Sequence, residues 1–95
     1  MKLSYPAILE FHKDGRADVV FPDFPGCVSQ GRDKADAQTQ AQEALQFHID
    51  GLQEDSEPIL PASIPKLKAM LSNYPPSRIS VVIVEAEVKE TPVNA

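Results

Sequence analysis

The 95-residue sequence has few of the features that would assign it to a membrane, a secretory route or a redox site. Its longest apolar run centres on Val81–Val84 and is far shorter than the roughly 20 residues that a membrane helix needs. Cys27 is the single cysteine, so a disulfide framework and a Cys-x-x-Cys metal pair are both excluded. No secretory signal is visible at the N-terminus, and we therefore expect a cytoplasmic protein.

Basic residues are also scarce. Nine Lys and Arg stand against 14 Asp and Glu, which gives a net charge of −5. Such a surface repels phosphate backbones, and basic residues are not interleaved with aromatic ones, so nucleic acid is not an expected direct partner. Neither a GxGxxG nor a Walker pattern is present, and we expect no cofactor and no small-molecule substrate. The acidity suits a basic protein partner or, alternatively, serves solubility alone.

The first third of the chain predicts three strands. Apolar and other residues alternate with a period of two over Leu3–His12, and the alternation resumes over Ala17–Phe21. Gly15 lies between them and can adopt positive φ without steric cost, which predicts an antiparallel hairpin. The segment Pro22–Gly26 carries two prolines and a glycine and must end the second strand. A third, short strand is predicted over Cys27–Gln30.

A long helix follows this strand. Asp33 is its predicted N-cap, and Asp36 lies in the first turn, where the helix dipole favours an anion. The segment Glu54–Pro58 should end the helix. Residues at helical spacing form one apolar stripe, in which the small alanines allow close packing on the sheet. The stripe consists of Ala37, Ala41, Ala44, Leu45, His48, Ile49 and Leu52, and the polar residues predicted to face water are Asp36, Gln40, Glu43, Gln46, Asp50 and Gln53.

The last third predicts a short helix and a final strand. Ile64–Leu71 has apolar residues on one face and Pro65 near its start, which predicts one or two helical turns. Ile79–Val88 is rich in β-branched residues, and we expect its start to be central in the sheet and its end exposed. The order β-β-β-α-β predicts an α+β fold of two layers, with about four mostly antiparallel strands and one long helix packed on one face.

The residue types allow three kinds of chemistry to be considered: nucleophilic catalysis, metal binding and Mg²⁺-dependent cleavage of nucleic acid. Cys27 could act as a nucleophile only with a histidine base, and His12 and His48 are the candidates, although a free cysteine is more often a packing residue. The same three residues lack the short spacing of a metal site. A small Mg²⁺-dependent nuclease is the alternative function, because several carboxylates could bind Mg²⁺, although aspartates in turns and caps usually have local roles. These carboxylates are Asp14, Asp18, Asp23, Asp33 and Asp36.

The segment Phe21–Cys27 is the strongest candidate for a binding site. Its two prolines restrict the chain, so little conformational entropy would be lost when a partner binds. It also carries two phenylalanines and the carboxylate of Asp23. The alternative interpretation is a tight turn whose phenylalanines pack into the core.

At this loop and the following helix the sequence resembles the HicB-like antitoxins of bacterial type II toxin–antitoxin systems. The pattern is a strand that ends in F-P-D-x-P-G-C, followed by S-x-G and a helix, and it extends over about 60 residues. The matching residues are Tyr5-Pro6-Ala7, Gly15, Phe21–Cys27, Ser29, Gly31, Ala41, Ala44, Leu45, Gly51-Leu52 and Pro58. The resemblance implies a partial RNase H-like fold without enzymatic activity, since no acidic quartet can be identified. The alternative keeps that fold and makes the chain a small Mg²⁺-dependent nuclease.

The resemblance also implies a partner and a site. Members bind and neutralise a small HicA-type toxin, a basic ribonuclease that cleaves mRNA. By this resemblance Asp23 and Ser29 should lie against the toxin's active site, with Phe24 and Pro25 as apolar contacts. Because a small sheet has unpaired edges, we also expect a homodimer or higher oligomer.

The resemblance further divides the chain into an antitoxin domain, residues 1–89, and a tail, residues 90–95. Typical members continue after the last strand into a DNA-binding segment and can form an autorepressor complex. The tail resembles the entry to such a segment at Val93-Asn94. DNA is therefore an expected partner only where such a segment follows.

Overall fold

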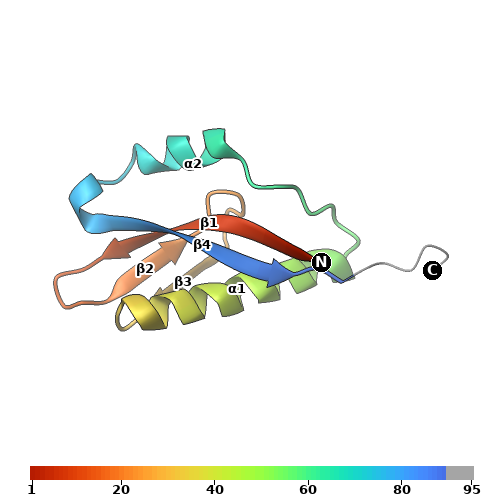
Figure 1. The fold of residues 1–95 in the computed structure, drawn as a ribbon, viewed down its shortest axis with the longest axis horizontal. Helices are drawn as coiled ribbons and strands as arrows, with labels where there is room; N and C mark the ends of the chain where they lie inside the picture. Colours follow the sequence, from red (N-terminus) through yellow and green to blue (C-terminus); the bar gives the residue numbers. More distant parts are fainter. Residues whose placement is uncertain (90–95) are drawn as a thin grey trace.

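A computed structural model describes residues 1–89 of the chain (Figure 1). The elements follow in the order β1 (Lys2–Phe11), β2 (Ala17–Val20), β3 (Val28–Gly31), α1 (Lys34–Glu54), α2 (Ile64–Leu71), a 3-10 turn (Pro76–Arg78) and β4 (Ile79–Glu87). In residues 1–89, neither α-helix is both long enough and apolar enough to cross a membrane. The predicted α+β fold is confirmed. The likeness to RNase H and the division at residue 89 stay predictions, and the predicted tail, residues 90–95, lies outside the described residues.

The four strands form one antiparallel sheet in the order β3-β2-β1-β4. β1 and β2 are the two inner strands, and β1 pairs with β2 through its second half and with β4 along nearly its whole length. The predicted hairpin is confirmed, and Gly15 adopts the expected positive φ of 93° in its turn. The first and last residues of β1, β2 and β3 each lie within one residue of the predicted limits.

The position of β4 corrects the prediction that its start is central. β4 is an edge strand, and Val81 and Ile83 in its first half are 41% and 66% exposed. Val84 and Ala86, nearer its end, are instead buried. The apolar run alternates between the two faces of the sheet, and α1 covers only the face to which the second pair points. Composition alone therefore overstated how deeply the start of this strand is buried.

α1 begins as the sequence predicts. Asp33 has extended backbone and its side chain accepts a hydrogen bond from the backbone N–H of Asp36 at 2.8 Å. Asp36 in turn accepts from the backbone N–H of Arg32 at 2.9 Å, and this bond lowers the pKa of the Asp36 carboxyl. The two aspartates thus hold the chain in position between β3 and the helix, and each satisfies an otherwise unpaired N–H.

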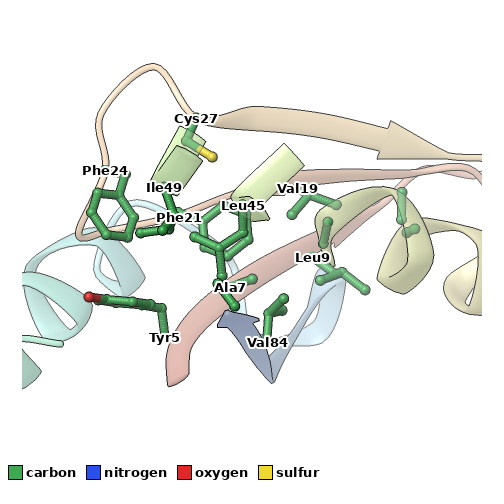
Figure 2. Close-up of a cluster of buried hydrophobic side chains, with 14 of the residues drawn as sticks. Tyr5, Ala7, Leu9, Val19, Phe21, Phe24, Cys27, Leu45, Ile49 and Val84 are labelled. Carbon is green, nitrogen blue, oxygen red and sulfur yellow. The ribbon is translucent and has the colours of Figure 1, made fainter. Parts of the chain in front are cut away.

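The core lies between α1 and the sheet, and the close-up in Figure 2 shows its buried side chains. The helix contributes the predicted stripe, of which four members are fully buried, while Ala44 and Leu52 pack against the core from its margin. The buried stripe residues are Ala37, Ala41, Leu45 and Ile49. They meet alternate residues of the strands, the largest of which are Tyr5, Leu9, Val19 and Phe21.

α1 lies in very close contact with the sheet at Gly31. A Cβ atom placed on Gly31 would lie 2.2 Å from the backbone nitrogen of Ala37 and 2.4 Å from its Cα. No side chain fits between these two backbones, so glycine is required here for contact rather than for its φ angle. The small residues Ala37 and Ala41 continue the close approach along the helix.

The segment that joins the end of α1 to the start of β4 contains α2 and the 3-10 turn. Ser63 is the N-cap of α2, and its hydroxyl accepts from the backbone N–H of Lys66. Pro65 occupies the first turn of the helix, as expected. In Figure 1 the sheet lies between α1 below and α2 above. The face of the sheet that points away from α1 is only partly covered, since Ile8 is buried there while Val28 and Ile83 are exposed.

The contact at Gly31 predicts a difference between two glycine substitutions. Gly31→Ala should lower the free energy of unfolding by about 1–3 kcal/mol, because α1 or β3 must move to admit the methyl group. Gly51→Ala, within α1, meets nothing within 4 Å and should raise it by about 0.5–1 kcal/mol through helix propensity. Urea denaturation of both variants is the measurement, and equal stabilities would contradict the close packing.

Candidate partner-binding site

The Phe21–Cys27 loop begins where the β1–β2 ladder must stop. Val20 is paired with Ile8, and the same register continued by two residues would place Pro22 opposite Pro6. Neither proline has an N–H to donate, so the two hydrogen bonds of that pair are unavailable. The chain instead makes two successive turns, in which Phe24 N–H donates to Phe21 O at 3.1 Å and Cys27 N–H to Phe24 O at 3.0 Å. Gly26 supplies the positive φ, 90°, that the second turn requires.

Three side chains anchor the loop from within. Phe21 and Cys27 are buried at its two ends, and Phe24 at its centre is only 8% exposed (Figure 2). The Phe24 ring makes an edge contact with Tyr5 at a centroid distance of 4.6 Å and lies 5.0 Å from the His48 ring. The loop is therefore packed against both β1 and α1, and its shape is set before any partner arrives.

Asp23 connects the loop to the segment before α2. Its Oδ1 accepts a hydrogen bond from the backbone N–H of Ser63 at 2.8 Å, while its Oδ2 is buried without a partner in the described residues. Close by, the Tyr5 hydroxyl donates to the carbonyl oxygen of Leu60. Burial, and secondarily the charge of Asp23, raises the pKa of Tyr5, so this hydroxyl stays a donor.

A small pocket of about 190 Å³ opens beside this contact. Its floor is the loop and α1, and its rim is the segment that leads to α2. The lining is mostly apolar, with one carboxylate, one imidazole and one ammonium group, from Asp23, Phe24, Pro25, His48, Leu52, Pro58, Leu60, Pro61 and Lys66.

The four residues predicted to contact a partner occupy different environments. Pro25 is exposed at the tip of the loop, and Asp23 is half-buried beside it. Phe24 belongs to the core, as the alternative interpretation of the loop had it, so its role as a partner contact stays a prediction. Ser29 lies in the edge strand β3, paired with Val19 and half-buried on the face toward α1. The structure thus groups Asp23 and Pro25 in one turn and places Ser29 on the adjoining strand.

Cys27 and the two histidines serve separate local contacts. The Cys27 Sγ lies 3.7 Å from the carbonyl oxygen of Ala44, and burial raises the pKa of this thiol. Cys27 thus lies among the buried core residues, which is the packing position that the sequence favoured. His48 packs on Phe24. His12 instead lies near the β1–β2 turn, with its Nε2 2.8 Å from Asp18 Oδ2. A carboxylate oxygen of Glu10 lies within 4.8 Å of both side chains.

The five aspartates considered for Mg²⁺ each have a nearby partner. Asp14 accepts from Arg16, and the Arg16 backbone N–H lowers the pKa of its carboxyl. Asp18 pairs with His12 and Asp23 with Ser63. The remaining two, Asp33 and Asp36, hold the start of α1. Each carboxylate therefore has the local role that aspartates in turns and caps commonly have.

Two glutamines of α1 that were predicted to face water instead bind the backbone at the end of β4 and just after it. The Gln46 amide donates to Glu87 O at 2.9 Å and accepts from Glu87 N–H at 2.8 Å. Gln53 makes the same pair of bonds with Lys89, at 2.8 and 3.1 Å. Both side chains lie at the margin of the apolar stripe, and only the position of β4 beside α1 distinguishes them from the exposed glutamines.

The Asp23 contact predicts a local effect of substitution. Asp23→Ala removes the acceptor of the Ser63 N–H and should raise the hydrogen-exchange rate of that amide several-fold, with a loss of about 1 kcal/mol in unfolding free energy. Asp23→Asn retains a carbonyl oxygen and should leave Ser63 protected. Amide exchange followed by NMR is the measurement. Equal Ser63 rates in the three proteins would show that the bond does not hold this segment.

Comparison with known proteins places the chain in a family. The sequence is 46% identical over 61 residues to a 14.9 kDa protein from the rep-hol intergenic region of Haemophilus phage HP1, and the match covers 64% of this chain and 44% of the phage protein. The chain therefore spans less than half the length of that relative.

Two solved structures share the fold. A toxin–antitoxin complex from Streptococcus pneumoniae matches with a TM-score of 0.74 at 18% identity, over 98% of this chain and 81% of the other. A HicA3–HicB3 toxin–antitoxin complex matches with a TM-score of 0.54 at 25% identity, over 93% of this chain and all of the other. The sequence model of the HicB-like antitoxins of bacterial toxin–antitoxin systems matches residues 5–94. The chain belongs to the HicB-like antitoxin family.

Proposed function

We propose that this protein is an antitoxin that binds a small, basic HicA-like toxin and prevents it from cleaving RNA. The observation that carries the proposal is the family match over residues 5–94, nearly the whole chain. The likeness to one chain of a HicA3–HicB3 complex supports a HicA-like partner. In this function the protein binds the toxin and covers its active site, and the toxin itself catalyses the RNA cleavage that is controlled.

The proposed contact surface is the outer side of the Phe21–Cys27 loop together with Ser29. A ribonuclease must present cationic and hydrogen-bond-donating groups where the RNA phosphate binds, and an inhibitor of that site should offer acceptors to them. Asp23 supplies a negative charge near the surface, since its Oδ1 accepts from Ser63 and its Oδ2 is buried. Ser29 supplies a half-buried hydroxyl, and Pro25 supplies an exposed apolar contact. Because Phe24 fixes the loop against Tyr5 and His48, little ordering would accompany binding.

Charge supports the choice of partner. The net charge of −5 would attract a basic toxin over a distance of about 10 Å at moderate ionic strength and would raise the rate of association. Local contacts at the loop would then determine the rate of dissociation. The two effects are separable, since one depends on total charge and the other on position.

Inhibition of a HicA-type toxin by two charge-matched variants tests the surface. Asp23→Asn keeps the size of the side chain and an acceptor for Ser63, but it removes the charge from the loop. We expect it to weaken inhibition by about tenfold or more, which corresponds to about 1.4 kcal/mol. The measurement is titration of RNA cleavage by the toxin, with thermal melts to confirm that each variant is folded.

Asp14→Asn is the matched control. It removes the same charge from an exposed side chain in the β1–β2 turn, at the other end of β2 from the loop. It should change inhibition by no more than the small effect of total charge. Equal inhibition by wild type and Asp23→Asn would remove the loop from the contact and would favour the helix surface at Glu43, Gln46 and Asp50.

The nuclease alternative has its own test. The purified protein should leave labelled RNA intact in the presence of Mg²⁺, because the five aspartates are held by separate local partners. The control is an Asp14→Ala/Asp23→Ala double variant of the same preparation. Cleavage by the wild type that is lost in the double variant would contradict a role limited to binding.

A further inference from the structure

The outer edge of β4 is covered at its end and open along the rest. As the last strand in the order β3-β2-β1-β4, β4 pairs with β1 on one side only. At Glu87 the Gln46 amide occupies the outward backbone N–H and C=O, and at Lys89 Gln53 does the same. These two amides take the place of a neighbouring strand, which is one way to protect a sheet edge.

Alternate residues upstream of Glu87 present their backbone groups to the same side. Ile83 is paired with Pro6, which has no N–H, and such a pair fits the positions in an antiparallel ladder that exchange no hydrogen bonds. The N–H and C=O of Ile83 therefore point outward, as do those of Val81 and Glu85. In residues 1–89 no other strand pairs with this part of the edge.

Space for another strand lies next to these groups. A groove of about 490 Å³ runs between β4 and α1, with Gln38 and Gln42 on its helix side and Val82–Glu87 on its strand side. On the face of the sheet away from α1, the Val81 and Ile83 side chains are 41% and 66% exposed. The edge thus combines unpaired backbone groups, adjacent room and exposed apolar surface.

We propose that the open edge of β4, residues 79–85, pairs with the same segment of a second copy, in the antiparallel direction, to form one continuous sheet of eight strands. Outward-facing residues must pair with outward-facing residues, and the Gln46 amide stops the ladder at Glu87. The longest symmetric register then places Val81 opposite Ile83 of the second copy, and Ile79 opposite its Glu85.

The charges along β4 favour a second copy in this direction. The strand follows the exposed Arg78 and carries the exposed Glu85 and Glu87 at its other end. Antiparallel pairing brings the basic end of one copy to the acidic end of the other, whereas parallel pairing would place Glu85 against Glu85. An apolar centre with opposite charges at its two ends is complementary to itself, as a two-fold interface requires.

Two lysine substitutions on the same face of the sheet test the proposal. Ile83 and Val28 are both β-branched apolar residues, and their side chains are 66% and 61% exposed. They lie on opposite edges of the sheet. Wild type at about 100 μM should sediment at twice the 10.4 kDa chain mass, given the micromolar affinity expected of a small interface. Ile83→Lys should raise the dimer dissociation constant at least tenfold, and Val28→Lys should leave it unchanged.

Hydrogen exchange identifies the paired edge independently of these variants. On dimerisation the outward amides of Val81, Ile83 and Glu85 should become protected, while those of Val82 and Val84, already bonded to β1, should change little. A wild-type protein that stays monomeric overturns the proposal, and so does a dimer in which the outward amides still exchange rapidly. Protection that arises only when a toxin is added would assign the edge to the toxin and equally overturn pairing with a second copy.

Discussion

The backbone contact between Gly31 and Ala37 determines where α1 crosses the sheet. With no side chain between them, the start of the helix lies directly on the edge strand β3, and the helix then runs across the sheet toward β4. Leu45 and Ile49 fill the space that opens along this path. At the far side, Gln46 and Gln53 reach the end of β4. One helix thus spans all four strands, and it does so on a single face.

This arrangement separates the surfaces that the two proposals use. The Phe21–Cys27 loop is held between β1 and α1 by Phe24, so its outer side is a fixed surface at one end of the core. The open edge of β4 lies on the opposite edge of the sheet from β3 and involves none of these residues. A pair of copies joined along β4 would leave both loops free to meet a toxin each.

Local signals in the sequence predicted the elements well, because each depended on nearby residues. The Asp33 cap fixed the start of α1, and Pro65 marked the first turn of α2. The sequence could not show that β4 lies at an edge, since strand order depends on which strand takes the centre. For the same reason Gln46 was assigned to solvent. The site itself came from the family resemblance, and the burial of Phe24 and the Asp23–Ser63 bond required the tertiary structure.

The facing prolines at the end of the β1–β2 ladder also bear on how the chain folds. A hairpin that slips by two residues keeps every side chain on its original face, so the hydrophobic pattern alone would not oppose the error. In the native register Ile8 pairs with Val20, and both residues have an N–H to donate. A slip in one direction places Pro6 opposite Val20, and a slip in the other places Pro22 opposite Ile8. Either slipped pair lacks one backbone hydrogen bond, because proline has no N–H. Two residues that end the ladder thereby select its alignment against the nearest misfolded alternatives.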